Sequence, residues 1–233
     1  SRRVNFVRDR VTGIDLKEKM ILASRQTLNY DLLLVGSGSE TNFYGNDEIR
    51  KAAFKLDNVD DVKDLAGVMS RERIGSYVIA GAGYTGIEVA TNLRIALNRK
   101  KIKGRIVIVE RATSILGPLP QWMKNYVLAN LKSMDIEVFT ESSVAGVSGR
   151  RIALSGGKVF DDAILIWAAG VETSGFIRNL NIEKNPQGRI KVDEYLRFHD
   201  SCFAAGDAAF FSYQGNYLRM AVQFSIMQGD CAG

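Results

Sequence analysis

Histidine and cysteine are scarce in this sequence, and their scarcity excludes several kinds of chemistry. The single histidine, His199, lies in the stretch RFHDS, which is typical of an exposed loop. We therefore exclude a multi-histidine metal site and a serine-histidine triad. The two cysteines, Cys202 and Cys231, form no CxxC pair, so a disulfide scaffold, a CxxC redox pair and a thiolate zinc site have no support. Such sparse cysteine suits a reducing compartment.

Proline and long apolar runs are also lacking. Only three prolines occur, and no low-complexity tract divides the chain, so domain boundaries have to be inferred from motifs. No uninterrupted apolar run approaches the about 18–20 residues that a membrane-spanning helix needs. The composition itself is that of an ordinary globular protein. Its 233 residues are 46% hydrophobic and 24% charged, enough for one large domain or two modest ones.

The formal net charge is +5, but the basic residues are scattered along the chain. Their densest cluster, NRKKIKGR at residues 98–105, is typical of a connection between a helix and a strand. A mildly basic, solvated surface explains this charge better than attraction to nucleic acid or anionic lipid. We therefore expect no nucleic-acid partner.

Hydrophobic patterning predicts an α/β protein. Residues 1–35 show β patterning, and residues 46–70 are helical with polar spacing. Strands are expected at 76–81, 104–110, 136–140, 150–156 and 163–170, with helices at 84–99 and 119–135. This order predicts a Rossmann-like half with an inserted β-meander. After Gly170 we expect a short helix, a strand at 188–196, a buried strand at CFAAGD and a helix over 219–232.

Residues 81–86 form a G-x-G-x-x-G turn, with the sequence Gly81-Ala82-Gly83-Tyr84-Thr85-Gly86. The pattern alone is weak, but here a strand precedes it, a helix follows it and an acid ends the next strand. Gly81 permits the tight turn, Gly83 leaves room for a pyrophosphate, and Gly86 lets the helix pack closely on the strand. The helix N-terminus offers free N–H groups and a positive dipole end to phosphates. The turn predicts a dinucleotide site, against the alternative of a packing turn without a ligand.

Glu110 is the acid that ends the next strand, 24 positions after Gly86. Its carboxylate is placed to accept hydrogen bonds from both hydroxyls of the adenosine ribose. A carboxylate there repels a 2′-phosphate, which favours NADH over NADPH, although Arg111 beside it softens that preference. Glu88, two positions past Gly86, has two interpretations of equal weight: an acid favoured by the helix dipole, or a residue at the nicotinamide end.

A second set of signals lies far from the glycine turn. The stretch FAAGD predicts a strand that runs into Gly206–Asp207 and then a helix, and Asp207 by itself is best explained as an N-cap. The stretch LLLVGSGSE at 32–40 is another buried strand. It ends in small residues, Ser37 and Gly38 among them, that suit a close approach of backbone to a ligand.

Together these motifs resemble one family. Their order is YD-hydrophobic-GS, GxGxxGxE, an acid-ended strand, WAAG, VDxxLR and AxGD. This order is similar to that of the flavoprotein reductases with two dinucleotide domains, in which an FAD domain and an NAD(P)H domain are interleaved. Within them, YDLLLVGSGSETNFYG and IWAAGV most resemble type II NADH dehydrogenases, the single-subunit NADH:quinone oxidoreductases. The resemblance spans nearly the whole chain.

The resemblance implies an enzyme that transfers hydride from NADH to FAD and passes electrons to a quinone or similar acceptor, without an acid–base catalytic residue. Gly206–Asp207 would hold the flavin ribityl chain, and Ser37–Gly38 would approach the flavin nucleotide. The residues near the nicotinamide would be Glu88, Ala169 and Gly170. The resemblance also implies a cytoplasmic location, and it allows a homodimer and peripheral attachment at the inner face of the membrane.

The chain departs from the family pattern in several places. The family opens with its own G-x-G-x-x-G turn for the FAD pyrophosphate, and nothing in residues 1–35 matches it. The family's C-terminal region is also missing, so the resemblance implies an internal fragment. Ser37 stands where the family's ATGS has threonine, and residues 222–227 keep one of the two glutamines in the AQxAxQ quinone motif. Redox-disulfide reductases and sulfide:quinone reductases are excluded because their cysteines are absent.

These expectations divide the chain into three segments. Residues 1–72 are expected to form the first part of a truncated, Rossmann-like FAD domain. Residues 73–171 would form a Rossmann-like NAD(H)-binding domain with the β-meander inserted, and residues 172–233 the second part of the incomplete FAD domain. The parent protein would be an FAD-dependent NADH oxidoreductase, with the fragment itself inactive. The alternative is an NAD(H)-binding sensor or scaffold module without turnover, which gains weight because the FAD turn is missing.

Overall fold

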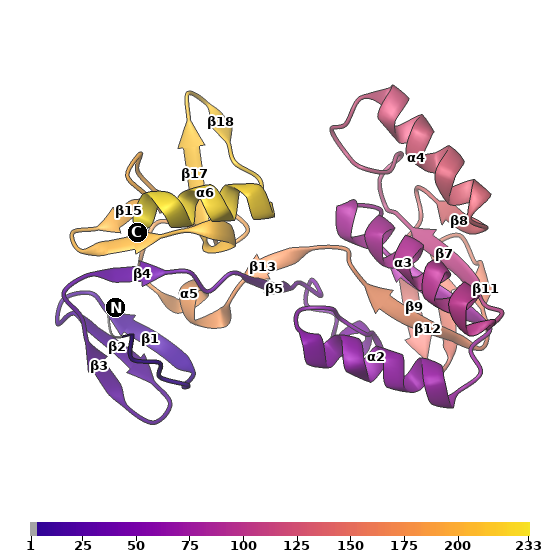
Figure 1. Ribbon diagram of the computed structural model, residues 1–233, viewed down its shortest axis with the longest axis horizontal. Helices are drawn as coiled ribbons and strands as arrows, with labels where there is room; N and C mark the ends of the chain where they lie inside the picture. Colours follow the sequence, from indigo (N-terminus) through magenta and orange to yellow (C-terminus); the bar gives the residue numbers. More distant parts are fainter. Residues whose placement is uncertain (1–3) are drawn as a thin grey trace. The chain divides into compact units, whose positions relative to one another are not determined.

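The computed structural model describes residues 4–233, which fold as two compact units. Thr41–Gly170 form one unit, called the inserted unit because it interrupts the other in the sequence. The other, the split unit, contains the residues up to Glu40 together with Val171–Gly233. Figure 1 shows the elements of both units.

The inserted unit is built on a four-stranded parallel sheet with the order β12-β6-β7-β8. Its strands are β6 (Ser76–Ala80), β7 (Arg105–Val109), β8 (Ile136–Phe139) and β12 (Ala163–Trp167). Helix α3 (Tyr84–Lys100) connects β6 to β7, and α4 (Gln121–Ser133) connects β7 to β8. An antiparallel meander of β9 (Val144–Ser148), β10 (Arg151–Leu154) and β11 (Val159–Phe160) precedes β12. The Rossmann-like half with an inserted meander is therefore confirmed.

Residues 46–70, expected to be helical, form two helices, α1 (Asp47–Ala52) and α2 (Val59–Arg71). The side chains of Asn46 and Asn58 cap the two starts by accepting backbone N–H groups. Between the helices the chain is extended, and Phe54 forms a single parallel bridge to Ile166 of strand β12. The break between α1 and α2 thus coincides with a tertiary contact at the edge of the sheet.

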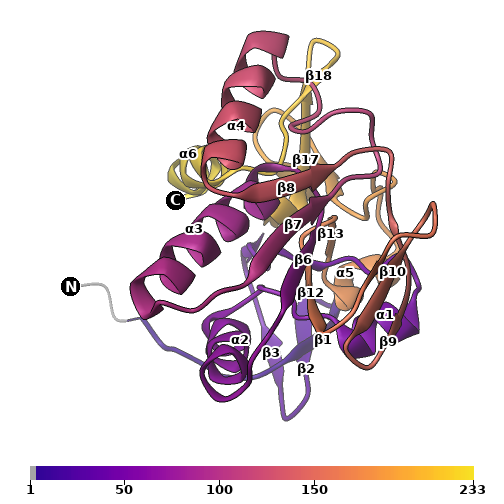
Figure 2. The same ribbon diagram turned by 90° about the vertical axis from the view of Figure 1, so that its right-hand side faces the viewer.

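The side chains of the sheet alternate between two apolar cores. On β6, Tyr77 and Ile79 point into the core that α2, α3 and α4 cover. Val78 and Ala80, the residues between and after them, point into the core that α1 and the meander cover. Figure 2 shows the resulting three layers, with α2, α3 and α4 on one face of the sheet and α1 with the meander on the other. A parallel sheet covered on both faces accounts for strands that are apolar at nearly every position.

The split unit mixes antiparallel hairpins with parallel strand pairs. Strands β1 (Val11–Asp15), β2 (Met20–Ala23) and β3 (Thr27–Asn29) form an antiparallel meander. Strand β4 (Leu33–Val35) pairs in parallel with β16 (Cys202–Ala204), which also pairs with β15 (Arg197–His199). The other elements are β5 (Ser39–Thr41), β13 (Val171–Thr173), α5 (Gly175–Asn179), β14 (Ile190–Val192), β17 (Ala209–Tyr213), β18 (Asn216–Tyr217) and α6 (Val222–Ala232).

The chain that follows Asp207 differs from the sequence-based expectation of a helix. Gly206–Ala208 form a single 3-10 turn, and the chain then continues into β17 and β18 before α6 begins. The residues after the turn, AFFSY, are rich in aromatic side chains, which favour a strand over a helix. Asp207 therefore does not cap an α-helix. His199 ends strand β15 instead of lying in a loop, and its side chain is exposed as expected.

The two units divide the chain at different residues from the three segments predicted above. Residues 41–72 belong to the same compact unit as the glycine turn, because α1 packs on one face of its sheet and α2 on the other. The N-terminal residues that share a unit with Val171–Gly233 are those up to Glu40. The assignment of FAD to the first and last segments and of NAD(H) to the middle one stays a prediction.

The central sheet strands should dominate the stability of the inserted unit. Ile108 of β7 is fully buried, so Ile108→Ala should lower the free energy of unfolding by about 2–5 kcal/mol. Ile95 of α3 is 43% exposed, so Ile95→Ala should cost less than about 1 kcal/mol. Urea unfolding followed by tryptophan fluorescence measures both, because Trp122 and Trp167 both lie in the inserted unit. Equal effects of the two substitutions would contradict this account of the core.

Candidate functional site

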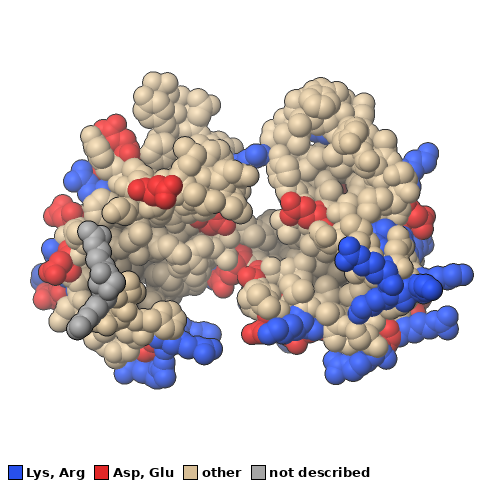
Figure 3. Space-filling view, viewed as in Figure 1, with Lys and Arg blue, Asp and Glu red and all other residues tan. Residues whose placement is uncertain are grey.

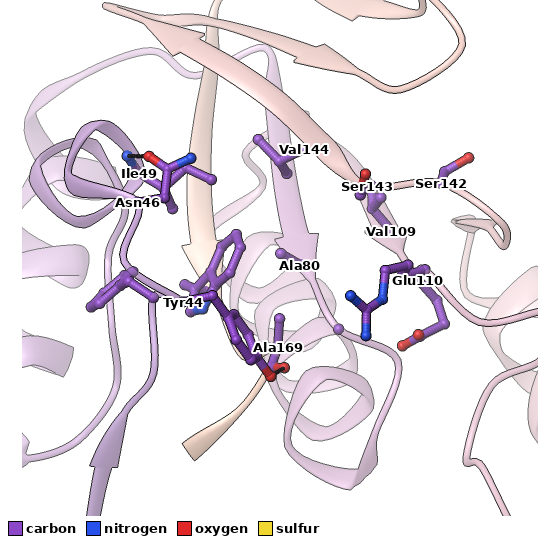
Figure 4. A pocket seen from close by; sticks show the side chains of 14 residues that line it. Tyr44, Asn46, Ile49, Ala80, Val109, Glu110, Ser142, Ser143, Val144 and Ala169 are labelled. Atoms are coloured by element: carbon purple, nitrogen blue, oxygen red, sulfur yellow. Dashed lines mark hydrogen bonds between the residues drawn. The ribbon is translucent and has the colours of Figure 1, made fainter. Parts of the chain in front are cut away.

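The carboxyl ends of strands β6, β7 and β12 border a cavity of about 330 Å³ in the inserted unit. Ligands of open parallel sheets bind at this edge, beyond the carboxyl ends of the strands. Figure 4 shows Glu110 on one side of Ala80 and Tyr44 on the other. The cavity lining includes four of the residues predicted from the sequence: Gly81, Glu110, Arg111 and Ala169.

Two glycines of the turn are required by the packing of the fold. Gly81 has φ of +105°, and a Cβ there would lie 2.5 Å from the carbonyl oxygen of Ala168. A Cβ on Gly86 would lie 1.9 Å from the carbonyl oxygen of Gly81. Both distances are impossible for real atoms, so any side chain at Gly81 or Gly86 would force strand β6, helix α3 or the end of β12 to move.

Gly83 has no such internal explanation. Its backbone is extended, with φ of −75° and ψ of −173°, which other residues adopt without strain. A Cβ at Gly83 would meet nothing within 4 Å. The missing side chain therefore leaves open space in front of the turn, as a backbone that receives a phosphate group requires.

The start of helix α3 is suited to an anion. Gly83 is its N-cap, no side chain caps the helix, and no acidic residue lies in its first turn. The side chains of Tyr84 and Thr85 are exposed. The N–H groups of the first turn and the positive end of the helix dipole therefore point to the space that Gly83 leaves open.

The Glu110 carboxylate is fixed beside the turn by two backbone groups. One oxygen accepts the Ala82 N–H at 2.8 Å, and the other accepts the Ala112 N–H at 2.8 Å. A carboxylate has about four lone-pair sites, so two remain for other donors. Glu110 thus holds the glycine turn in place and keeps lone pairs that other donors can reach.

The other lining residues form two groups, one at each end of the cavity. Arg111 and the loop residues Ser142 and Ser143 lie with Glu110 at the ends of β7 and β8. At the β12 end, the Tyr44 hydroxyl donates to the Ala169 carbonyl at 3.0 Å. A Cβ on Gly170 would lie 2.2 Å from the Tyr44 hydroxyl oxygen, so Gly170 permits this contact.

Sequence reasoning did not single out Tyr44 or the two serines. Tyr44 belongs to the stretch TNFYG, which contributed to the family resemblance, but its pattern carries no sign of a contact with residues 169–170. The serines lie in a short loop whose position depends on β8 and the meander. These residues become visible only once the strands are placed in space.

Glu88 does not line this cavity. Its side chain is exposed, and it borders a separate groove between α2 and α3 together with Thr85. The structure therefore places Glu88 beside the first turn of α3, as both interpretations of the sequence allow. Its role at a nicotinamide stays a prediction.

The second set of predicted residues comes together in the split unit. Strands β4 and β16 run side by side in parallel, so Ser37 and Gly38 after the one strand lie at the same sheet edge as Gly206 and Asp207 after the other. The Ser39 hydroxyl donates to the Asp207 carboxylate at 2.8 Å. Gly38 has φ of +67°, and a Cβ there would meet nothing within 4 Å. The backbone at Gly38 is therefore open to a close approach.

Two residues that sequence reasoning missed hold the Gly206–Asp207 turn. The side-chain oxygen of Gln228 accepts the Gly206 N–H at 2.7 Å, and Gln228 is only 6% exposed. Arg189 is 3% exposed, and its guanidinium donates to the carbonyl oxygens of Asp207 and Leu218. Burial lowers the pKa of Arg189, and the negative charge of Asp207 opposes that shift.

Residues 4–233 contain neither a metal-binding cluster nor a membrane-spanning helix. No cluster of three or more histidine, cysteine, aspartate or glutamate side chains there is arranged to hold a metal ion. None of the helices in this range combines the length and apolar character that crossing a membrane requires. Cys202 is buried and Cys231 is exposed, and both are free thiols.

Comparison with known sequences gives a consistent family. The pattern of the pyridine nucleotide-disulphide oxidoreductases matches residues 2–232. Among curated proteins, the type II NADH:quinone oxidoreductase NdhA of Mycobacterium tuberculosis is 26% identical, over 90% of this chain and 53% of its own length. The demethylphylloquinone reductase NdbB of Synechocystis is 27% identical, over 88% of this chain and 54% of its own length. The chain thus spans about half the length of these relatives.

Comparison with solved structures gives the same fold. An FAD-dependent pyridine nucleotide-disulphide oxidoreductase from Desulfovibrio vulgaris superposes with a TM-score of 0.81 at 24% identity. The match covers 98% of this chain and 61% of that protein. The arrangement of strands and helices described above is therefore that of a known fold.

The open space at Gly83 allows a test of whether the glycine turn binds the pyrophosphate of NADH. Gly83→Val should abolish NADH binding, because an isopropyl group would occupy the place where phosphate oxygens meet the backbone N–H groups. The melting temperature should stay near that of the unmodified chain, because the backbone angles of Gly83 suit valine. Titration calorimetry and thermal unfolding measure the two effects on one variant.

Gly86→Ala provides the matched control for the same turn. Its new Cβ would collide with the Gly81 carbonyl, so the melting temperature should fall by at least about 5 °C. If Gly83→Val still binds NADH, the pyrophosphate does not bind against Gly83. Equal losses of melting temperature in the two variants would show that Gly83 serves the fold instead.

Proposed function

We propose that this chain, which belongs to the pyridine nucleotide-disulphide oxidoreductase family, binds NADH through its inserted unit and serves an FAD-dependent NADH oxidoreductase. The single observation that carries the proposal is the glycine turn. Two of its glycines are explained by packing, and the third, Gly83, leaves open space at an uncapped helix start. That combination is what a dinucleotide pyrophosphate needs.

NADH would lie across the carboxyl ends of the strands. Its pyrophosphate would bind at residues 82–86, and its adenosine ribose would bind the Glu110 carboxylate, with Arg111 beside it. The nicotinamide would lie at the other end of the cavity, near Ala169 and Gly170. Because Ala80 at the end of β6 lies between Glu110 and Tyr44, the cavity has the extended layout that this pose requires.

The split unit offers part of a second nucleotide site. The open backbone at Gly38 and the Asp207 carboxylate lie at neighbouring strand ends, so these residues fit a ligand with hydroxyl groups such as the flavin ribityl chain. Bound FAD would supply the redox chemistry, taking hydride from NADH and giving electrons to an acceptor. The chain's own residues would position the two nucleotides, and none of them has to move a proton.

A quinone is the acceptor that the relatives favour. Two of the relatives are an NADH:quinone oxidoreductase and a demethylphylloquinone reductase. In this chain, Gln223 of α6 is exposed, whereas Gln228 is buried against Gly206. Gln223 is therefore the glutamine that remains accessible to an acceptor. The homodimer, the membrane attachment and the cytoplasmic location stay proposals that follow from the resemblance alone.

The competing proposal is an NAD(H)-binding module without turnover. It rests on the same glycine turn, because open space at an uncapped helix start would bind a dinucleotide whether or not hydride is transferred. The two proposals differ in one measurement on a longer protein that carries this chain and holds FAD. For an oxidoreductase, NADH added without oxygen should bleach the flavin absorbance, and a quinone should restore it. A module without turnover would leave the absorbance unchanged.

Glu110→Ala should weaken NADH binding by about 10- to 100-fold. The charge-assisted bonds to the ribose are worth about 1.5–3 kcal/mol, and each 1.4 kcal/mol corresponds to tenfold in affinity. The substitution should also narrow the preference for NADH over NADPH, because the repulsion of a 2′-phosphate disappears. Parallel titrations of both nucleotides give the ratio. If Glu110 only held the turn in place, its loss would weaken NADH and NADPH binding equally. An unchanged ratio of the two affinities would therefore contradict the ribose role of Glu110.

The purified 233-residue chain should not retain stoichiometric FAD. Asp207 and Ser37–Gly38 leave the flavin pyrophosphate without a glycine turn and a helix N-terminus. Absorbance in the visible flavin bands after purification measures the occupancy. One FAD per chain would contradict the expectation and would show that the residues at the ends of β4 and β16 suffice.

A further inference from the structure

A second hollow lies in the inserted unit, away from the candidate nucleotide cavity. It is a groove of about 410 Å³ between helices α2 and α3. The two helices lie side by side on the same face of the sheet (Figures 1 and 2). The apolar residues that line the groove are Leu56, Val62, Leu65, Ala66, Met69, Val89, Leu93, Ala96 and Ile166. Thr85 and Glu88, near the start of α3, also line the groove.

The lining of the groove is mostly apolar and includes Ile166 of strand β12. A volume near 410 Å³ with a mostly apolar lining lies in the range of small-molecule sites. The size and the apolar lining of the groove therefore suit an alkyl chain.

The charge at the two ends of the groove differs in sign. Lys100, in the last turn of α3, lines one end, where its ammonium group donates to the Ser70 hydroxyl at 3.2 Å. Within residues 4–233 it forms no ion pair with a carboxylate. Glu88 lines the other end, twelve residues earlier on α3 and therefore about 18 Å away. An anionic group would be attracted to the Lys100 end and repelled from the Glu88 end.

Other basic residues near Lys100 add to the positive charge at this end of the groove. Arg71, Arg99, Lys101 and Lys103 are exposed around the ends of α2 and α3. Figure 3 shows Lys and Arg side chains gathered on the side of the inserted unit where these helices end. Basic residues are common in last turns because they complement the helix dipole. Lys100 differs from that general case because it also borders the open end of an apolar groove.

We propose that the α2–α3 groove binds a single-chain anionic amphiphile, such as a long-chain carboxylate. The alkyl chain would lie along the groove over Leu65, Met69 and Ile166, and the headgroup would bind the Lys100 ammonium. The negative charge of Glu88 would repel the headgroup from the other end of the groove and so set the direction of the alkyl chain. The site is separate from the cavity at the strand ends, so it does not depend on the proposed binding of NADH.

Titration calorimetry of the 233-residue chain with monomeric dodecanoate tests the proposal. We expect one site per chain, and we expect the shorter hexanoate to bind at least about tenfold more weakly, because fewer methylene groups are buried. Ala66→Phe should abolish binding, because Ala66 lines the groove from an exposed position and a phenyl ring there fills it. Thermal unfolding checks that this variant keeps its fold.

Charge reversal at matched lysines locates the headgroup. Lys100→Glu should weaken dodecanoate binding at least about fivefold. Lys132→Glu is the control, because Lys132 is an exposed lysine in the last turn of α4 and does not line the groove. It should leave binding unchanged. No binding of dodecanoate, equal effects of the two reversals, or unchanged binding by Ala66→Phe would each overturn the proposal, and absent binding would point to a protein segment as the occupant.

Discussion

The close approach of helix α3 to the end of strand β6 is the contact on which the inserted unit depends. The backbone at Gly86 comes so near the Gly81 carbonyl that an added Cβ would lie 1.9 Å from that oxygen. This contact sets where α3 begins, and therefore where its uncapped N–H groups and the positive end of its dipole point. It also leaves Gly83 in open space and brings the Ala82 N–H within 2.8 Å of the Glu110 carboxylate. The open space at an uncapped helix start and the position of the Glu110 carboxylate beside it thus follow from a single approach of two backbone segments.

Local patterns in the sequence were sufficient for much of this unit. Parallel strands covered on both faces are continuous apolar runs, and the glycine spacing marks the turn between β6 and α3, so these elements were predicted within a few residues of their observed ends. The break between α1 and α2 was not predicted, because it arises where Phe54 pairs with strand β12. The unit boundary at Thr41 was not predicted either. Residues 41–72 belong to the unit of the glycine turn because α1 and α2 pack on the two faces of its sheet. Sequence patterns describe local preference, and these features depend on distant partners.

The candidate residues show the same limit more sharply. Glu110 could be found because its distance from the turn is fixed by one helix and one strand. Ser37 and Asp207 are far apart in the sequence, and they lie at the same edge of a sheet because β4 and β16 pair in parallel, which no local pattern reveals. Their association was expected only from the resemblance to a family. Ser39 and Gln228 carried no signal, because polar residues of these types are common. Only their contacts distinguish them, since one bonds the Asp207 carboxylate and the other bonds the Gly206 N–H from a nearly buried position.

The two candidate sites use one structural rule and opposite electrostatics. Both lie where neighbouring parallel strands end, which is the edge at which such sheets receive ligands. In the inserted unit a helix begins directly after the strand, and its N-terminus attracts phosphate. In the split unit a 3-10 turn and strand β17 follow β16, so no α-helix starts at Gly206–Asp207. The Asp207 carboxylate lies there instead, and it accepts a hydrogen bond from the Ser39 hydroxyl. Asp207 therefore repels phosphate and accepts hydrogen bonds from hydroxyl groups, which is the chemistry of a polyol chain. The first site can hold the charged centre of a dinucleotide, whereas the second is suited to an uncharged, hydroxyl-rich part of one.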